Sequence, residues 1–463
     1  MMRHLKLFIF LSCILPISVF CQTEEDALFI KEIHDYILKE GKCYSWLETL
    51  SEEIGGRLTG SENAAKAVEY TGHELSKIAD EVTYQEIMVP HWVRGKEEKA
   101  HIINKVGDII HELNVTALGN SIGSGPEGVK AQVIEVKTLD QVRKMGREKI
   151  EGKIVFYNRP MDPTLVNTFH AYGGAGDQRV NGPAVAAELG AVGAIVRSLT
   201  TLTDNLPHTG TLRYKEGVPT IPAVAVSTLH ADLLSKELSK GGVMMYMETH
   251  SEMLSDKPSH NVVAEIKGSE FPDEIILVGG HLDSWDLAGG AHDDGAGCVH
   301  SMEVMNALKE LNYVPKRTLR VVLFMNEENG LAGGREYARI SKQEGEYHLA
   351  ALESDAGGFT PRGFSFDAED EIFAGLYRQI TELAPLLEPY NLHFAKGGSG
   401  ADIGPLKDQK GLLIGFRPDS QRYFDFHHSA ADNIDAVNER ELKLGAAAMT
   451  SLIYLIDKYG LEH

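Results

Sequence analysis

The 463-residue sequence contains few cysteines, and this excludes one class of small exported protein. There are four in total, and Cys13 and Cys21 lie within the first 21 residues. The remaining two, Cys43 and Cys298, are too few for a fold built on a framework of disulfide bonds. A single bridge between them and two free buried thiols are both compatible with the sequence.

Basic residues are also in the minority. Lysine and arginine together number 45 against 67 aspartates and glutamates, so the formal net charge is −22. This charge disfavours general electrostatic binding to nucleic acid or to anionic membrane surfaces. After residue 21 no apolar run is long enough to cross a membrane, so no integral membrane span is expected.

The N-terminus has the layout of a secretory signal peptide. Two basic residues precede an apolar run from Leu7 to Phe20, and the sequence then becomes polar abruptly. This pattern predicts export, to the periplasm or the medium, after removal of residues 1–21. Lipid attachment at Cys21 fits the pattern less well, because the residue before it is bulky.

The length of the chain predicts two domains, because it exceeds what one hydrophobic core usually supports. Turn residues cluster at Gly119 to Gly128, and short β-like runs with Gly- and Pro-rich turns follow. We expect residues 125–257 to form a β-rich insert with a covering or binding role, closed by Asp256 to Ser259. The main domain would then comprise residues 22–124 and 258–463.

The main domain is expected to have an α/β fold with a mostly parallel central sheet flanked by helices. Apolar strands such as EIILVGG and LRVVLFM alternate with helical stretches at residues 298–311 and 331–340. Strands that alternate with helices favour a parallel sheet. Ligands of such sheets bind beyond the carboxyl ends of the strands.

Polar residues capable of metal binding follow these strands where each strand ends. One such residue alone is usually a hydrogen-bonding group of the fold, but a series at successive strand ends indicates one site. Two imidazoles and three carboxylates suit zinc or another first-row divalent ion. The residues are His281, Asp293, Asp294, Glu327, Glu328, Asp355, His427 and His428.

Five ligands and a spare glutamate indicate two ions about 3.5 to 4 Å apart, with a bridging carboxylate and a bridging water as nucleophile. Neighbouring residues of a strand point to opposite faces. Glu327 and Glu328 can therefore reach one site only if the backbone already turns at Asn326 to Glu328.

The segments GGHLDSW, DDGAG, NEENG, ESDAGG and FHHSAAD, in this order, closely resemble the co-catalytic dinuclear zinc exopeptidases. The resemblance extends over nearly all of the chain after the signal peptide, including the insert, which looks like a protease-associated domain. It implies two Zn²⁺ per chain, a homodimer, and hydrolysis of dipeptides or release of a terminal residue from short peptides.

The resemblance also implies individual roles for the metal-binding residues. Asp293 would bridge the two zinc ions. His281 and Asp355 would complete the coordination of one ion, and Glu328 and His428 would complete that of the other.

Two acidic residues would act beside the metal ligands. In the family, the residue at the position of Glu327 is the general base, which takes a proton from the metal-bound water and passes it to the leaving amine. Asp283 resembles the carboxylate that accepts a hydrogen bond from the second imidazole nitrogen of the ligand His281 and so fixes its tautomer.

The adjacent histidines leave one choice of ligand. His428 matches the family pattern because Ser429 and Asp432 follow it, whereas His427 does not. His427 would face the substrate and stabilise an oxyanion, or it would serve in packing or in supporting a ligand.

The glycine-rich loop KGGSGADIGP carries Ser399 and Asp402. In related enzymes a loop at this position lines the substrate cleft, so these residues are candidates for substrate binding. A plain flexible loop is the alternative.

Two other functions use the same fold. An aminopeptidase acting on longer peptides would need the free amine beside the cleaved bond, whereas a carboxypeptidase needs the free carboxylate there. A non-catalytic receptor-like binding protein is the second alternative, although five converging ligands would repel one another without metal.

Overall fold

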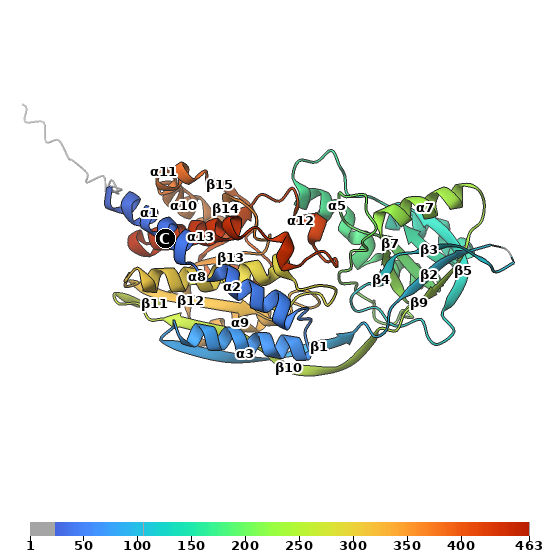
Figure 1. The fold of residues 1–463 in the computed structure, drawn as a ribbon, viewed down its shortest axis with the longest axis horizontal. Helices are drawn as coiled ribbons and strands as arrows, with labels where there is room; N and C mark the ends of the chain where they lie inside the picture. Colours follow the sequence, from blue (N-terminus) through green and yellow to red (C-terminus); the bar gives the residue numbers. More distant parts are fainter. Residues whose placement is uncertain (1–23, 105, 463) are drawn as a thin grey trace, which may run out of the picture.

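The computed structural model describes residues 24–104 and 106–462, which form two lobes, each built on a β-sheet (Figure 1). The predicted signal peptide, residues 1–21, and the lipid-attachment candidate Cys21 lie outside these ranges. Within the described ranges, no helix is both long and apolar enough to cross a membrane. Cys43 and Cys298 are both free and buried.

The first lobe contains a sheet to which the described residues contribute eight strands. In spatial order these are β1 (Glu81–Val93), β10 (Glu252–Ile266), β12 (Arg317–Phe324), β11 (Phe271–His281), β13 (Tyr347–Glu353), β16 (Leu412–Pro418), β14 (Pro361–Asp367) and β15 (His393–Lys396).

Helices cover both faces of this sheet. Along β11, Ile276 and Val278 pack into the larger apolar cluster with α8 and α13, whereas Ile275 and Leu277 join a smaller cluster beneath α9. This alternation is the two-residue period of a strand buried on both faces. The helices of the lobe are α1 (Glu24–Glu40), α2 (Cys43–Glu48), α3 (Glu62–Ser76), α8 (Ala296–Glu310), α9 (Ala332–Glu344), α10 (Asp370–Thr381), α11 (Ala384–Leu387), α12 (Tyr423–Phe426) and α13 (Glu439–Tyr459), with short helical turns η1 (Thr49–Ile54), η2 (Ala291–Gly295), η3 (Glu388–Tyr390), η4 (Gly404–Gln409) and η5 (Ile434–Ala436).

The first sheet is mixed, with a parallel centre. Four of the seven strand pairings in the described residues are parallel, namely those among the central strands β12, β11, β13 and β16 and that of β14 with β15. The pairings of β1 with β10, β10 with β12 and β14 with β16 are antiparallel. The antiparallel strands enter from chain segments that do not follow the strand–helix–strand pattern. The parallel centre still brings the carboxyl ends of β12, β11, β13 and β16 to one edge.

The second lobe contains a smaller mixed sheet with flanking helices. Its strands in the described residues are, in spatial order, β3 (Ile109–Leu113), β2 (Lys99–Ile103), β9 (Met244–Glu248), β5 (Val129–Val136), β6 (Ile154–Tyr157), β7 (Gly193–Arg197), β8 (Ala223–Val226) and β4 (Val115–Ala117). Its helices are α4 (Leu139–Ile150), α5 (Thr168–Val180), α6 (Gly182–Glu188) and α7 (Thr228–Ser239). Because β2, β3 and β4 precede residue 125, the division between the sheets does not coincide with the domain boundary predicted there.

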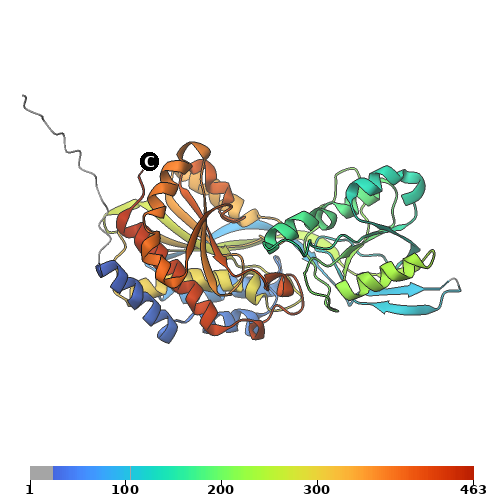
Figure 2. The ribbon, with the colours of Figure 1, turned by 90° about the horizontal axis from the view of Figure 1, so that it is seen from above.

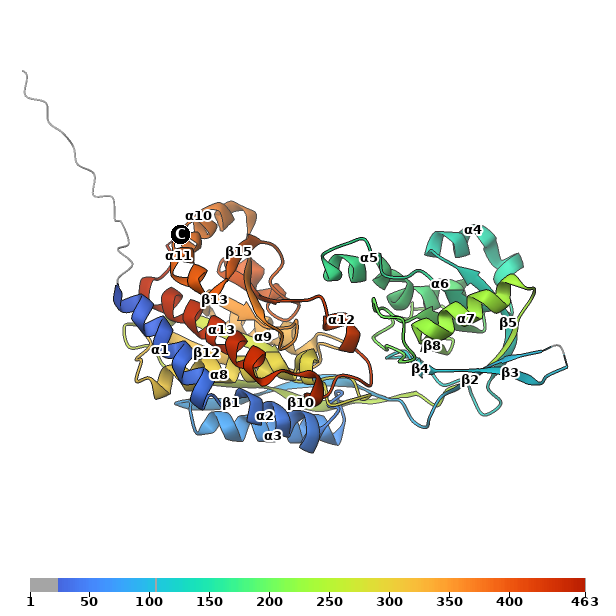
Figure 3. The ribbon, with the colours of Figure 1, turned by 45° about the horizontal axis from the view of Figure 1, so that its top comes forward.

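The two lobes are connected by one long antiparallel pair, β1 and β10 (Figures 1 and 3). Asp256 to Ser259, which were expected to close the insert, lie within β10, so the strand runs without interruption across the predicted boundary. Pro258 is tolerated there because β10 pairs only with β1 at this point, and pairing with β12 begins at Val262. Viewed from above, the lobes lie side by side (Figure 2).

Candidate active site

The predicted site residues gather at the carboxyl edge of the parallel strands. His281 is the last residue of β11, and the Glu327–Glu328 pair follows the end of β12 at Phe324. Asp355 lies two residues beyond β13. The chain order of the motifs is therefore converted into one site by the parallel pairing of neighbouring strands.

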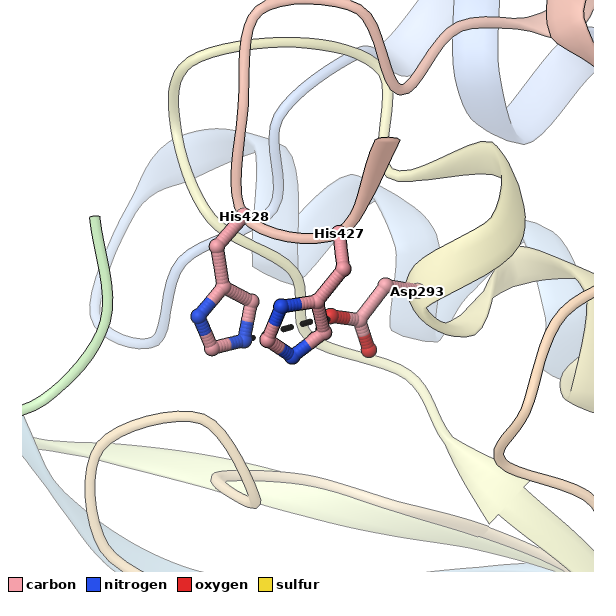
Figure 4. Close-up of side chains that lie close together, drawn as sticks. All are labelled: Asp293, His427 and His428. Atoms are coloured by element: carbon pink, nitrogen blue, oxygen red, sulfur yellow. Dashed lines mark ion pairs between the residues drawn. The ribbon is translucent and has the colours of Figure 1, made fainter. Parts of the chain in front are cut away.

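Asp293 lies at the centre of the site. Its Oδ1 is 3.2 Å from Nε2 of His281, and its Oδ2 is 3.2 Å from Nε2 of His428. Figure 4 shows this carboxylate beside the rings of His427 and His428. The two oxygens thus face different imidazoles, as a carboxylate that bridges two metal ions requires.

The remaining predicted ligands flank Asp293 on its two sides. Oδ1 of Asp355 is 3.8 Å from Nε2 of His281, and Oε2 of Glu328 is 3.0 Å from Nε2 of His428. Two ligands of a tetrahedral zinc ion, with bonds of about 2.0 to 2.1 Å, lie roughly 3.4 Å apart. The observed separations of 3.0 to 3.8 Å bracket that value.

Two buried oxygens of these ligands lack a hydrogen-bond donor among the described residues. They are Oδ2 of Asp293 and Oε1 of Glu328. A buried carboxylate oxygen without a donor is costly unless a cation neutralises it. Their donor set of imidazole and carboxylate groups is the one that zinc prefers, so the residues fit two zinc ions.

The candidate ligands include carboxylates and imidazoles, which shift one another's pKa values. Burial disfavours the ionised form of Asp293, but His281 and His428 hold the pKa of this carboxyl well below its ordinary value. Burial likewise opposes a charged His428, yet Glu328 and Asp293 raise the pKa of the imidazole well above its ordinary value. Protons and metal ions therefore compete for the same lone pairs.

The backbone turn predicted at the two glutamates is confirmed. β12 ends at Phe324, and Asn326 adopts a left-handed conformation with φ of 78°. Glu328 points towards His428, while Glu327 lines the adjacent cavity. Burial and the neighbouring carboxylates of Asp355 and Glu328 raise the pKa of Glu327 well above its ordinary value.

Asp283 differs from its predicted role. The Nδ1 of His281 lies 2.9 Å from the backbone carbonyl of Asp283, whereas the Asp283 carboxylate is 3.8 Å away. That carboxylate instead accepts backbone N–H bonds from Asn326, Glu327 and Glu328, at 2.7, 3.0 and 3.3 Å. The side chain therefore orients the turn that carries Glu327 and Glu328, and the backbone orients the histidine.

Two further carboxylates hold the metal-binding segments in place. Asp432 accepts the backbone N–H groups of His292 and Asp293, at 2.7 and 3.0 Å. Asp294 accepts those of His281 and Gly297, at 3.1 and 3.0 Å. Asp294 thus ties the end of β11 to the first turn of α8.

His427 lies against the ligand His428. The rings are stacked with centroids 3.5 Å apart, and Nε2 of His427 is 3.7 Å from Oδ2 of Asp293. Both histidines can therefore be grouped with Asp293 around one ion. His428 is the better ligand, because it alone also contacts Glu328. His427 lines the cavity and packs against His428, so both predicted roles, contact with substrate and support of a ligand, fit its position.

Ser399 and Asp402 are not on the cavity wall formed by the described residues. Both are buried, and Asp402 is 0% exposed. Glu353 explains this difference from the prediction, because its carboxylate accepts the backbone N–H groups of Ala401, Asp402 and Ile403 at 2.8 to 3.0 Å. These bonds turn the loop into the protein.

The cavity beside the candidate metal ligands has a volume of about 570 Å³ and is lined by both lobes. The first lobe contributes the candidate ligands Asp293, Glu328, Asp355 and His428 together with Glu327, Asn329, Gly330, Leu331, Arg335, Tyr423, Phe424 and His427. The second lobe contributes Asn120, Phe169, Tyr172, Arg179, Thr211 and Arg213. The sequence assigned a covering role to the insert but did not identify these residues.

The second lobe also holds the backbone of the two histidines. Nδ1 of His208 lies 2.7 Å from the carbonyl oxygen of His427, and the N–H of Thr209 donates to the carbonyl oxygen of His428 at 2.8 Å. Tyr172 of α5 stacks on Phe424 of α12, with ring centroids 4.7 Å apart. The site is therefore assembled from both lobes.

Arg57 is a structural residue that the sequence did not reveal. Its fully buried guanidinium donates to the carbonyl oxygens of Leu282, Gly289 and Gly290, at 2.8, 2.5 and 3.0 Å. It thereby shapes the segment between His281 and Asp293. No local pattern signals such a role, because the partners lie more than 220 residues away.

The chain is similar to known proteins in sequence. Residues 261–453 match the model of peptidase family M28. Carboxypeptidase Q of Bos taurus is 33% identical over 90% of this chain and 85% of its own length, and that of Xenopus laevis is 34% identical over 90% and 86%.

Solved structures agree with this result. A peptidase M28 precursor from Shewanella amazonensis has a TM-score of 0.88 and 33% identity, covering 95% of this chain and 98% of its own. A zinc aminopeptidase from Bacillus subtilis has the same fold, with a TM-score of 0.64 and 17% identity over 91% and 96% of the chains. The chain therefore belongs to peptidase family M28 and is a zinc metallopeptidase, similar to carboxypeptidase Q over most of its length.

Proposed function

We propose that this zinc metallopeptidase is an exported exopeptidase that hydrolyses dipeptides or releases a terminal residue from short peptides. The observation that carries the proposal is the cavity of about 570 Å³ beside the candidate metal ligands, part of whose wall the second lobe forms. Pockets of roughly 300 to 1,000 Å³ are typical of sites for small ligands. A cavity of this size between two lobes suits a substrate of few residues better than the middle of a long chain.

Two zinc ions per chain would be held by the ligands that face Asp293. His281 and Asp355 would bind one ion together with one oxygen of Asp293, and Glu328 and His428 would bind the second together with the other oxygen. When bound, such ions lower the pKa of a coordinated water towards about 7 and polarise the scissile carbonyl.

Glu327 would move the proton. It lies next to the ligands but is free of the ion pairs that occupy Glu328, and it lines the cavity. Its raised pKa means that this carboxylate accepts a proton more readily than a free glutamate does, as a group that takes a proton from water and then donates it to the leaving amine must. Asp283 holds the turn so that this carboxylate faces the substrate.

The test of this function uses the full chain with zinc. Glu327→Gln should retain two zinc ions and lose about 10²- to 10⁴-fold in kcat, the usual contribution of a general base. Glu328→Gln is the matched comparison, and it should lower zinc stoichiometry as well. Full activity of Glu327→Gln would show that another group is the base.

Product identification with dipeptides and blocked tripeptides tests polarity. An N-blocked tripeptide that is cleaved at its C-terminal bond supports a carboxypeptidase. If the chain cleaves only peptides whose N-terminal amine is free, and only at the first peptide bond, the aminopeptidase alternative is supported. A purified chain that neither binds zinc nor cleaves any dipeptide would refute the enzyme function, in favour of a binding protein.

Export by the predicted signal peptide and assembly as a homodimer remain parts of the proposal. Secretion of a tagged full-length chain, with its N-terminal residue identified, tests the cleavage site at Gln22. Light scattering of the purified chain tests the dimer.

A further inference from the structure

Arg179, in the last turn of α5, is a buried cation in the wall of the substrate cavity. It is 7% exposed, and none of the described residues forms a hydrogen bond or an ion pair with its guanidinium. Its Nε is fully enclosed and has no acceptor. Tyr172 provides a ring 5.3 Å from the guanidinium carbon, but no carboxylate.

The guanidinium lies close to the metal ligands. A Cβ added to Gly210 would lie 2.4 Å from Nη1 of Arg179 and 2.7 Å from Nδ1 of His428, so both groups contact the same glycine. Gly210 has φ of 129°, a conformation that also favours glycine. Because Gly210 has no side chain, the guanidinium of Arg179 in the second lobe can approach His428 in the first lobe.

A buried charge without a counter-ion is unfavourable, and a protein normally pairs it. The nearby carboxylates Asp293 and Glu328 lie 3.2 and 3.0 Å from Nε2 of His428 and are proposed to bind zinc, so neither serves as the counter-ion of Arg179. A partner for Arg179 must therefore enter through the cavity. The planar guanidinium presents parallel N–H donors that match a carboxylate with two hydrogen bonds.

We propose that Arg179 binds the free α-carboxylate of the substrate's C-terminal residue and so selects peptides that end one residue after the cleaved bond. This inference rests on the proposed exopeptidase function. Three covalent bonds separate the scissile carbonyl carbon from the α-carboxylate carbon of the next residue, a span of less than about 4 Å. Arg179 lines the same cavity as Asp293, Glu328 and His428, so a substrate whose scissile carbonyl lies at these residues can direct its α-carboxylate along the cavity towards the guanidinium.

Arg213 and Arg335 extend the positive charge along the same cavity. Both line it, are exposed, and form no side-chain ion pair with the described residues. The N–H of Arg213 donates to the carbonyl oxygen of Val180, next to Arg179, at 2.9 Å. Exposed charges of this kind attract an anionic ligand and affect its association rate more than its final binding.

The test compares three substrates: Ala-Leu, its C-terminal amide, and Ala-Asp amide. The wild-type chain should cleave Ala-Leu with a kcat/KM about 100-fold above that for either amide, as expected for a buried charge pair. Arg179→Met should lose about 100-fold on Ala-Leu, chiefly in KM, and change by less than about threefold on Ala-Leu amide. Arg179→Lys should retain part of the preference for Ala-Leu over Ala-Leu amide, because lysine keeps the positive charge but lacks the two parallel N–H donors.

Arg143→Met is the matched control. Arg143 lies in the same lobe on α4, exposed and paired with Asp140, and its replacement should leave the preference unchanged. Inhibition of the wild-type chain by leucine and by leucinamide gives a measurement independent of any variant, and leucine should bind at least about 30-fold more tightly.

Three outcomes would overturn the inference. In the first, Arg179→Met lowers kcat/KM equally for Ala-Leu and for Ala-Leu amide, as expected if Arg179 has a structural role or stabilises the oxyanion. In the second, Ala-Asp amide is cleaved as fast as Ala-Leu, which would assign Arg179 to a side-chain carboxylate. In the third, wild type cleaves acid and amide equally and leucine binds no more tightly than leucinamide. Failure of wild type to cleave any of the three would instead refute the proposed function itself.

Discussion

Replacement of Asp283 by asparagine tests whether one buried carboxylate sets the position of the catalytic turn. Its Oδ1 accepts the N–H groups of Asn326 and Glu327, and its Oδ2 accepts that of Glu328. An asparagine that keeps its oxygen at the Oδ1 position presents an NH₂ group to the N–H of Glu328. Two donors then face each other, and the two remaining bonds lose their charge assistance.

The expected cost follows from these three bonds. A buried donor left without an acceptor costs about 1 to 3 kcal/mol, and a bond to a charged group is worth roughly 1 kcal/mol more than a neutral one. The free energy of unfolding should therefore fall by about 3 to 5 kcal/mol. A displacement of Glu327 and Glu328 by about 1 Å should lower kcat/KM by about 100-fold, with partial loss of one zinc ion.

The assay combines urea denaturation, zinc stoichiometry and dipeptide hydrolysis on the same preparations. Asp286→Asn is the control, because Asp286 lies in the same segment but is partly exposed and pairs with Arg94 at 2.6 Å. It should cost about 1 kcal/mol or less, as partly exposed ion pairs do. An Asp283→Asn chain with the stability, zinc content and kcat/KM of the control would refute the reasoning.

Three further predictions concern residues that are not proposed metal ligands. Arg57→Lys should lower the free energy of unfolding by about 2 to 4 kcal/mol in urea, because one ammonium cannot satisfy the carbonyls that the guanidinium holds; wild-type stability would contradict this role. Burial raises the pKa of Glu303 to about 7, so the folded state binds a proton more tightly than the unfolded state, and the stability this provides is present below pH 4.5 and lost by about pH 7. Relative to Glu303→Gln, wild type should lose about 3 kcal/mol of unfolding free energy between pH 4.5 and 7.5. If the unfolding free energies of the two chains change in parallel with pH, Glu303 does not titrate in this way. His208→Phe removes the contact with the carbonyl of His427 and should raise KM about threefold to tenfold with zinc retained, as expected for loss of one hydrogen bond of about 1 kcal/mol; an unchanged KM would show that the contact is dispensable.

The site could be predicted from the sequence to the extent that local patterns determine it. His281, Glu328 and Asp355 follow buried strands, and parallel pairing brings the ends of such strands together. The turn after β12 was predictable as well, because two adjacent residues of a regular strand cannot face one site. These inferences need only the residue order and the geometry of a strand.

What the sequence did not reveal depends on contacts between distant segments. β2 pairs with β9, about 140 residues later, and its five residues carry no strong pattern of their own. The carbonyl of Asp283, rather than its carboxylate, contacts the imidazole of His281, a difference of backbone conformation that residue identity does not determine. The loop with Ser399 turns inward because of Glu353, which belongs to another strand.

The antiparallel pair β1 and β10 fixes the length of both chain connections between the lobes at once. The pairing already has one irregularity, between Val89 and His91, where β10 contributes one residue more than β1. Outside such a bulge, an additional residue in one strand alone would shift its register against the other and direct the following side chains to the opposite face. A change in the length of one connection therefore requires a bulge or a matching change in the other, whereas loops within the second lobe can vary separately. Arg179 and His208, both in the second lobe, lie beside His428 and His427 of the first lobe. The spacing between the lobes that this strand pair sets is therefore a requirement of the active site in addition to its ligands.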